Sequence, residues 1–168
     1  MNPITNEEMA DTLNGLVKIN NDRMTGYQQV ATEIDDTSLR VVFENMVNES
    51  VNFAENLGAY VRDFGGTPVT GGTLAGTIHQ GWINVKDALV GNNREAMLES
   101  CEFGDKAAIE AYETALATDA ITQNSELKTV LNGQKSSITQ SLQVIKSISR
   151  SKTATNTQAE RETLGNTY

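Results

Sequence analysis

The sequence predicts an all-α protein built as a four-helix bundle. Four long stretches carry apolar residues at the three- and four-residue spacing of an amphipathic helix. The chain has only two Pro and few aromatic residues among 168, a composition that suits helices better than an all-β domain. A long glycine-rich stretch separates the second helix from the third. We therefore expect two helical hairpins joined by one long crossover.

The first hairpin follows from its capping and turn signals. Thr5 and Glu8 form a capping box that starts a helix expected over residues 6–33. A turn and N-cap cluster at 35–38 separates it from a second helix. The second helix should end at the sequence Gly-Gly-Thr-Pro, residues 65–68. Because the connection is short, these two helices should be antiparallel neighbours.

The connection from residue 65 to about residue 93 is unusually long for a compact domain. Gly residues punctuate it, and a short helix from about Ile78 to Val90 is expected to turn Trp82 toward the core. The second helix spans about 40 Å at 1.5 Å per residue, and an extended piece plus a short helix can cover that length. The crossover should therefore deliver the third helix parallel to the second.

The second hairpin follows the crossover. Asn92 and Glu95 offer another capping box, which starts a third helix that should end near Thr118. A fourth helix should start near Asn124, and its apolar stripe continues to Ile148. Two helical hairpins joined by one long crossover form the ferritin-like version of the four-helix bundle.

The C-terminal end differs in composition from the bundle. Residues 149–168 are almost all polar, so we expect a fraying helix end and a disordered or partner-docked tail. The predicted organisation is one ferritin-like bundle over residues 1–150 and a polar tail over 151–168.

Net charge and cysteine content limit the classes of partner and of cellular compartment that the sequence fits. A net charge of −9 argues against nucleic acid and against an anionic membrane surface. A single Cys cannot form an internal disulfide and fits a reducing compartment. We find no secretory signal and no apolar stretch near the roughly 20 residues of a membrane span. We expect a soluble cytoplasmic protein that forms a homo-oligomer through helix faces.

Polar residues interrupt the apolar stripe near the middle of every helix. Matching positions across the first hairpin sets Arg23 level with Glu49. In the second hairpin, Asp105 is about level with Gln134. These positions predict one polar layer across the bundle. Its expected members are Asn20, Arg23, Glu49, Ser50, Asn52, Glu102, Asp105 and Gln134.

Such a layer holds metal in many ferritin-like proteins. A di-iron or di-manganese site needs a Glu from each of two helices and a Glu-x-x-His pair from each of the other two. Here Asn52 and Asp105 stand where those His would be, and the one His, His79, lies in the crossover. Two interpretations stay open. One is a hydrogen-bonded layer that fixes helix register. The other is a site formed by Glu49, Glu102 and Asp105 that binds iron or manganese with weak or no redox chemistry.

Single residues offer weaker candidates for chemistry. His79 is expected to be a hydrogen-bonded side chain packed near Trp82 under the crossover. Cys101 lies on the apolar stripe of the third helix, which favours an inert buried thiol. The sequence predicts no catalytic residue.

Two runs of sequence are distinctive: HQGWINVKDAL at 79–89 and LESCEFGDKAAIEAYETAL at 98–116. They resemble a bacterial ferritin-like four-helix-bundle family that is catalogued only as a domain of unknown function. The resemblance covers about residues 8–149. It implies the ferritin-like fold, a loose association with stress proteins and no established activity. The matching positions are Leu13, Asn14, Gly26, Tyr27, Gly76, His79, Gly81, Trp82, Cys101, Glu102, Tyr112 and Gln134.

The chain departs from the pattern of that family on the fourth helix. The pattern carries His-Asp where this chain has Leu142 and Gln143, and it tends to have Glu where this chain has Ser137. If those groups bind a metal in the family, this chain lacks them. We therefore expect a non-catalytic structural protein, with a metal-binding bundle as the alternative and a partner-binding module that uses the tail as a third hypothesis.

Overall fold

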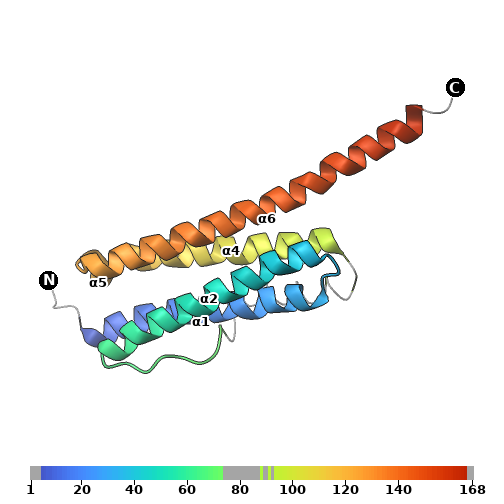
Figure 1. Ribbon diagram of the computed structural model, residues 1–168. Helices are drawn as coiled ribbons and strands as arrows, with labels where there is room; N and C mark the ends of the chain where they lie inside the picture. Colours follow the sequence, from blue (N-terminus) through green and yellow to red (C-terminus); the bar gives the residue numbers. More distant parts are fainter. Residues whose placement is uncertain (1–4, 74–87, 89–90, 92, 166–168) are drawn as a thin grey trace.

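The computed structural model describes residues 5–73, 88, 91 and 93–165, with side chains described only as far as residue 151. The described residues form helices and no strands, which confirms the all-α prediction. Most of the predicted crossover helix, with His79 and Trp82, lies outside the described residues. The helices are α1 (Asn6–Glu33), α2 (Thr37–Asp63), α4 (Arg94–Leu116), α5 (Asp119–Thr122) and α6 (Ser125–Gly165) (Figure 1).

The four long helices form a bundle of two hairpins (Figure 1). The closest packing is between α1 and α2 and between α4 and α6, and α1 also packs on α4. Bonds from Asn20 to Tyr112 and from Arg23 to Asp105 pair α1 with α4 in opposite chain order. Because α1 is antiparallel to both α2 and α4, α4 runs parallel to α2, as the long crossover predicts.

Local signals fix the ends of the first hairpin. Thr5 and Glu8 make the predicted capping box, with Thr5 N donating to Glu8 at 2.8 Å and Glu8 N donating to Thr5 Oγ1 at 3.1 Å. At the end of α2, Gly65 has a φ of 77°. Gly66 N donates to the carbonyl of Val61, which completes a Schellman turn. A side chain at Gly66 would place its Cβ 2.6 Å from Cβ of Ala10, so the turn packs directly on α1.

Three polar side chains of α1 hold the start of the crossover along this helix. Asn14, Asn21 and Asp22 lie about two turns apart from first to last and bind backbone groups of the segment 67–73. This segment therefore runs beside α1, back along the bundle (Figure 1). The contacts are Asn14 to the carbonyl of Thr67 and the N–H of Val69, Asn21 to the carbonyl of Gly71, and Asp22 to the N–H and hydroxyl of Thr73.

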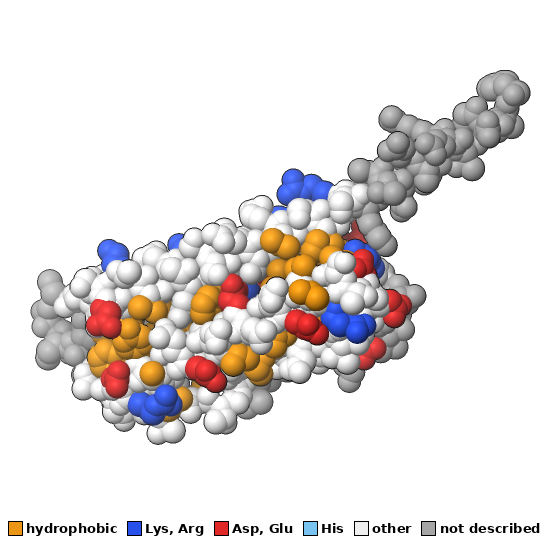
Figure 2. Space-filling model, viewed as in Figure 1, with side chains coloured by type: hydrophobic (Ala, Val, Ile, Leu, Met, Phe, Trp, Pro, Cys, Tyr) orange, Lys and Arg blue, Asp and Glu red, His pale blue; other side chains and the backbone are white. Residues whose placement is uncertain are grey.

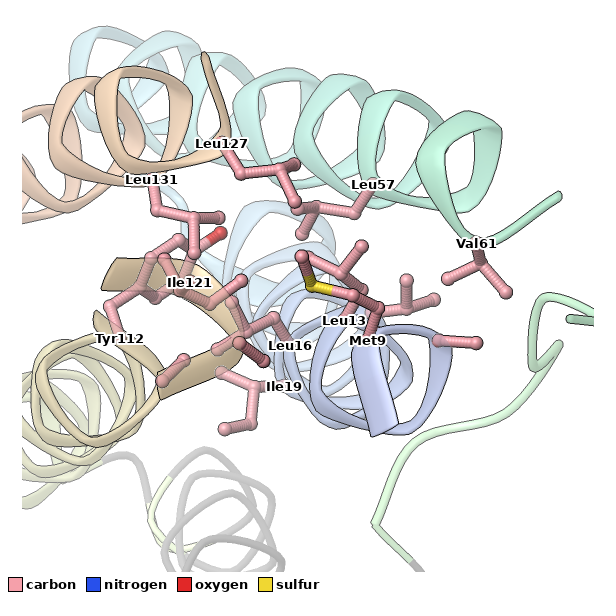
Figure 3. Packing of buried hydrophobic residues seen from close by; sticks show 14 of the residues in the cluster. Met9, Leu13, Leu16, Ile19, Leu57, Val61, Tyr112, Ile121, Leu127 and Leu131 are labelled. Carbon is pink, nitrogen blue, oxygen red and sulfur yellow. The ribbon is translucent and has the colours of Figure 1, made fainter. Parts of the chain in front are cut away.

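Buried apolar residues form two clusters along the bundle. In the first, labelled side chains from all four long helices converge, among them Leu13, Leu57, Tyr112 and Leu127 (Figure 3). On α1 this cluster ends at Ile19, and the second begins at Tyr27. The polar layer lies between the two clusters.

Two helix boundaries differ from the sequence prediction. The N-cap of α4 is Asn93, whose side chain accepts a bond from Ala96 N at 3.0 Å, and the predicted cap at Asn92 is one residue early. The predicted fraying near Ser149 is also wrong for the backbone, because α6 continues to Gly165. No Gly or Pro stands between these two positions to stop the helix. Within the described residues, no helix has the length and hydropathy of a membrane span.

Candidate functional site: a buried polar layer centred on Arg23

Arg23 is the centre of the polar layer and is completely buried. Its Nε donates to Oδ1 of Asp105 on α4 at 2.8 Å. One terminal nitrogen donates to Oγ of Ser50 at 3.1 Å, and the other donates to Oε1 of Glu49 at 3.2 Å, both on α2. The guanidinium thus binds two carboxylates and one hydroxyl from two other helices, as its planar fork of donors allows.

Glu49 carries the network onward to α6. Its Oε2 accepts a bond from the Ser137 hydroxyl at 2.6 Å, and its Oε1 accepts one from the Ser141 hydroxyl at 3.3 Å. The Glu49 side chain keeps 21% of its surface exposed, whereas the Arg23 side chain has none. One connected network therefore contacts α1, α2, α4 and α6.

A second set of hydrogen bonds lies one turn farther along and centres on Tyr112. The Tyr112 hydroxyl accepts from Nδ2 of Asn20 at 2.8 Å and donates to Oε1 of Gln134 at 2.8 Å. The Gln134 amide in turn donates to Oδ1 of Asn56 at 3.0 Å. This chain runs from a fully buried amide on α1 to an exposed residue on α2, again through α4 and α6.

Aromatic rings close the opposite side of the Arg23 site. The Tyr27 ring lies 5.5 Å from the guanidinium carbon and stacks on Phe43, with 6.0 Å between ring centroids. A cation above an aromatic face is attracted to its negative quadrupole. Burial raises the pKa of the Asp105 carboxyl, and the Tyr27 hydroxyl beside it opposes part of that rise.

Burial and charge act in opposite directions on the ion pair. Burial by itself lowers the pKa of Arg23, but the negative charge of Asp105 and Glu49 outweighs it, and the net pKa is raised. Arg23 is therefore always charged. Burial raises the pKa of Asp105, and the charge of Arg23 opposes that rise. The layer thus has a fixed cation with two carboxylates held against it.

The three residues predicted as metal ligands do not come together in the structure. Glu49 and Asp105 meet at Arg23, whereas Glu102 points to Lys106, one turn along α4, at 3.4 Å. Among the described residues, no group of three or more His, Cys, Asp and Glu side chains is placed to hold a metal ion. A cation that bound both layer carboxylates would have to displace the guanidinium.

Some members of the layer were misjudged from the sequence. Asn52 is exposed, and Asn56 takes the predicted place. At 100° per residue, Asn56 lies on the same face of α2 as Glu49, whereas Asn52 is rotated by about 60°. Ser137 and Ser141 were missed as partners of Glu49. Their signal is the spacing of four residues, which places two small hydroxyl groups on one face of α6.

Cys101 is confirmed as a buried thiol beside the layer. Burial raises its pKa, and the charges of Asp105 and Glu102 raise it further. The thiolate form is therefore suppressed, and with it the reactivity of this residue.

Comparison with known proteins places the chain in a family. Residues 8–118 match the model of a family described as a domain of unknown function, DUF2383. The chain belongs to this family. The matched range contains α1, α2 and α4, and with them Arg23, Glu49 and Asp105. The match ends at residue 118, not near 149 as expected, so Ser137 lies outside the part shared with DUF2383. No curated protein and no solved structure matches the chain.

Proposed function

We propose that this DUF2383 chain is a non-catalytic, ferritin-like bundle protein in which the Arg23 layer fixes the register of the four long helices. One observation carries the proposal: the network from Asp105 through Arg23 and Glu49 to Ser137 contacts every long helix. Helix order, helix directions and the long crossover support the ferritin-like part of the proposal.

The network acts on register because its partners lie at fixed heights. Sliding α1 by one turn, about 5.4 Å, would move Arg23 from the polar layer into one of the two apolar clusters. A buried guanidinium without a carboxylate partner costs several kcal/mol. Apolar packing alone discriminates weakly between registers, since one apolar turn resembles the next. The charged layer therefore favours the native register over shifted registers more strongly than the apolar core can.

The chemistry of the layer favours a structural role over catalysis. Arg23 cannot serve as a base, because its pKa is raised further by its carboxylate partners. Asp105 has no exposed surface and already binds Arg23, so a substrate cannot reach it without opening the bundle. Glu49 has partial access to solvent, but its two oxygens already accept bonds from Arg23 and two Ser hydroxyls.

Elemental analysis tests this proposal against the metal-binding alternative. The protein is purified without chelator, and iron, manganese and zinc are measured before and after incubation with ferrous or manganous salt. We expect far less than one metal per chain and no rise in melting temperature with either ion. Glu49→Gln and Glu102→Ala are measured in parallel. Near-stoichiometric metal that disappears in these variants would overturn the register role.

A further inference from the structure

One buried side-chain oxygen in the polar layer lacks a donor. The Asn20 side chain has no exposed surface, and both N–H groups of its amide are used. Nδ2 donates to the Leu16 carbonyl at 2.9 Å and to the Tyr112 hydroxyl at 2.8 Å. The amide cannot be turned over, because its oxygen would then face the Leu16 carbonyl, which only accepts hydrogen bonds. Among the described residues, no group donates to Oδ1 of Asn20.

An acceptor of this kind is unusual in a protein core. The large majority of buried polar side-chain atoms are hydrogen-bonded, and an oxygen that loses water without gaining a donor destabilises the fold. Internal water molecules commonly supply the partner. They occur about once per 27 residues and make about three hydrogen bonds each. The Asn20 oxygen therefore indicates a buried water site, provided that other polar groups lie around it.

Arg23 provides donors beside this oxygen. It lies three residues after Asn20, on the same face of α1. A guanidinium has five N–H groups, and the bonds to Asp105, Ser50 and Glu49 use three of them. Two N–H groups thus remain for a further partner.

The guanidinium is also close to the hydroxyl that Asn20 binds. Burial raises the pKa of the Tyr112 hydroxyl, and the charge of Arg23 opposes that rise. Arg23 and Asn20 therefore act on the same hydroxyl group of α4.

Asp105 provides a second acceptor. Its Oδ1 accepts the bond from Arg23 at 2.8 Å. Its Oδ2 accepts no bond of ordinary geometry from the described residues, although the Tyr27 hydroxyl lies beside this carboxyl. A carboxylate oxygen can accept two hydrogen bonds, so Oδ2 has room for a further donor.

These three side chains are sealed from bulk solvent. Asn20, Arg23 and Asp105 each have no exposed surface. On the face that Figure 2 shows, apolar and uncharged atoms cover most of the middle of the bundle. A ligand at this place must therefore be small, and it must enter and leave through transient opening of the bundle.

We propose that the polar layer binds one internal water molecule between Asn20, Arg23 and Asp105. The water accepts an N–H of Arg23 and donates one hydrogen to Oδ1 of Asn20 and the other to Oδ2 of Asp105. A cation does not fit this set of groups, because it offers no acceptor to Arg23 and is repelled by the guanidinium charge. The water joins the hydrogen bonds centred on Tyr112 to those centred on Arg23.

A crystal structure of the full chain at high resolution tests the site directly. We expect a water peak at about 2.7–3.2 Å from Oδ1 of Asn20 and from a terminal nitrogen of Arg23. Well-ordered side chains without this peak would overturn the proposal, and so would a protein donor bonded to Oδ1. Either result would leave the register role of Arg23 standing, because the bonds of that role run directly between side chains.

Magnetic relaxation dispersion of the water deuterons tests the site in solution. This measurement counts the internal waters that stay bound for longer than the tumbling time of the protein. Asn20→Leu keeps a similar volume but removes the acceptor, so the count should fall by one relative to wild type. Equal counts for wild type and Asn20→Leu would show that no long-lived water is bound at Asn20, and the proposal would be wrong.

The neighbouring residue provides the matched control. Asn21 also lies on α1, but its amide donates to the Gly71 carbonyl at 3.0 Å near the surface. Asn21→Leu should therefore keep the wild-type count of internal waters. An equal fall in both variants would mean that the lost water does not belong to Asn20, which would also contradict the proposal.

Discussion

Arg23 on α1 and Asp105 on α4 form an ion pair with 2.8 Å between Nε and Oδ1, and neither side chain has any exposed surface. The pair joins the two hairpins of the bundle at the boundary between its two apolar clusters. Its partners Glu49 and Ser50 extend the contact to α2. A buried pair of this kind contributes little net stability compared with apolar residues, but the loss of one partner is costly.

Removing the carboxylate of this pair should destabilise the protein strongly. Asp105→Ala leaves the Arg23 guanidinium buried with only Glu49 and Ser50 as partners, and we expect a loss of about 3–5 kcal/mol in the free energy of unfolding. The double variant Arg23→Met, Asp105→Leu should recover a large part of that loss, because no buried charge remains. Guanidinium chloride unfolding measures both. A loss below about 1 kcal/mol for Asp105→Ala would contradict the buried ion pair.

The Tyr112 hydroxyl should matter far more than a second hydroxyl with a similar bond. Tyr112→Phe leaves the buried acceptor of Gln134 without its donor, at an expected cost of about 1–3 kcal/mol in unfolding free energy. Tyr60 provides the matched control, because its hydroxyl also donates to an α6 side chain, Glu126, at 2.8 Å, but at the surface. Tyr60→Phe should change stability by less than about 0.5 kcal/mol. Equal losses of unfolding free energy for the two variants, measured by urea unfolding, would show that burial does not make the Tyr112 bond more important than the Tyr60 bond.

The prediction of the layer from the sequence succeeded where a residue type is unusual and failed where it is common. Arg23 and Glu49 interrupt an apolar stripe, and matching positions within one hairpin sets them level. The link from Arg23 to Asp105 crosses between hairpins, and no turn length relates α1 to α4. The link from Glu49 to Ser137 depends on the distance between α2 and α6, which the sequence does not encode in a short motif.

The crossover illustrates the same limit. Its length predicts that α4 runs parallel to α2, and the structure confirms this direction. The three α1 side chains that hold the segment 67–73 were not predicted, because Asn and Asp on a helix are usually solvated. Only the path of the segment beside α1 gives Asn14, Asn21 and Asp22 their backbone partners.

Two adjacent glycines in this segment should respond differently to substitution. A Cβ at Gly72 would collide with the Asp22 carboxylate, which is held by Thr73, whereas a Cβ at Gly71 meets nothing within 4 Å. Gly72→Ala must therefore break the Asp22 bonds or move the segment, at an expected cost of about 1–3 kcal/mol. Gly71→Ala should be neutral within about 0.5 kcal/mol. Thermal unfolding of the two variants tests whether the segment lies against α1, and equal melting temperatures would argue against it.

Stability should fall at alkaline pH, because three buried acids resist ionisation. Burial raises the pKa of Cys101, Tyr27 and Tyr112 above the ordinary values of 9.0 for the thiol and 10.0 for the phenols. A raised pKa means that the folded state keeps its proton while the unfolded chain releases it. The stabilising contribution is complete below the unfolded pKa values and is lost as the pH rises above about 9 toward the folded values.

The slope of the unfolding free energy against pH shows how much each buried acid contributes. Each acid that ionises only in the unfolded chain lowers the unfolding free energy by up to about 1.4 kcal/mol per pH unit. Cys101→Ala removes the group that ionises first, so its unfolding free energy should decline less steeply than wild type between about pH 9 and 10.5, even though the variant starts from a lower stability. Urea unfolding across this pH range measures the slopes. Parallel curves for the two proteins would mean that the Cys101 thiol ionises in the folded state and is not sealed in the core.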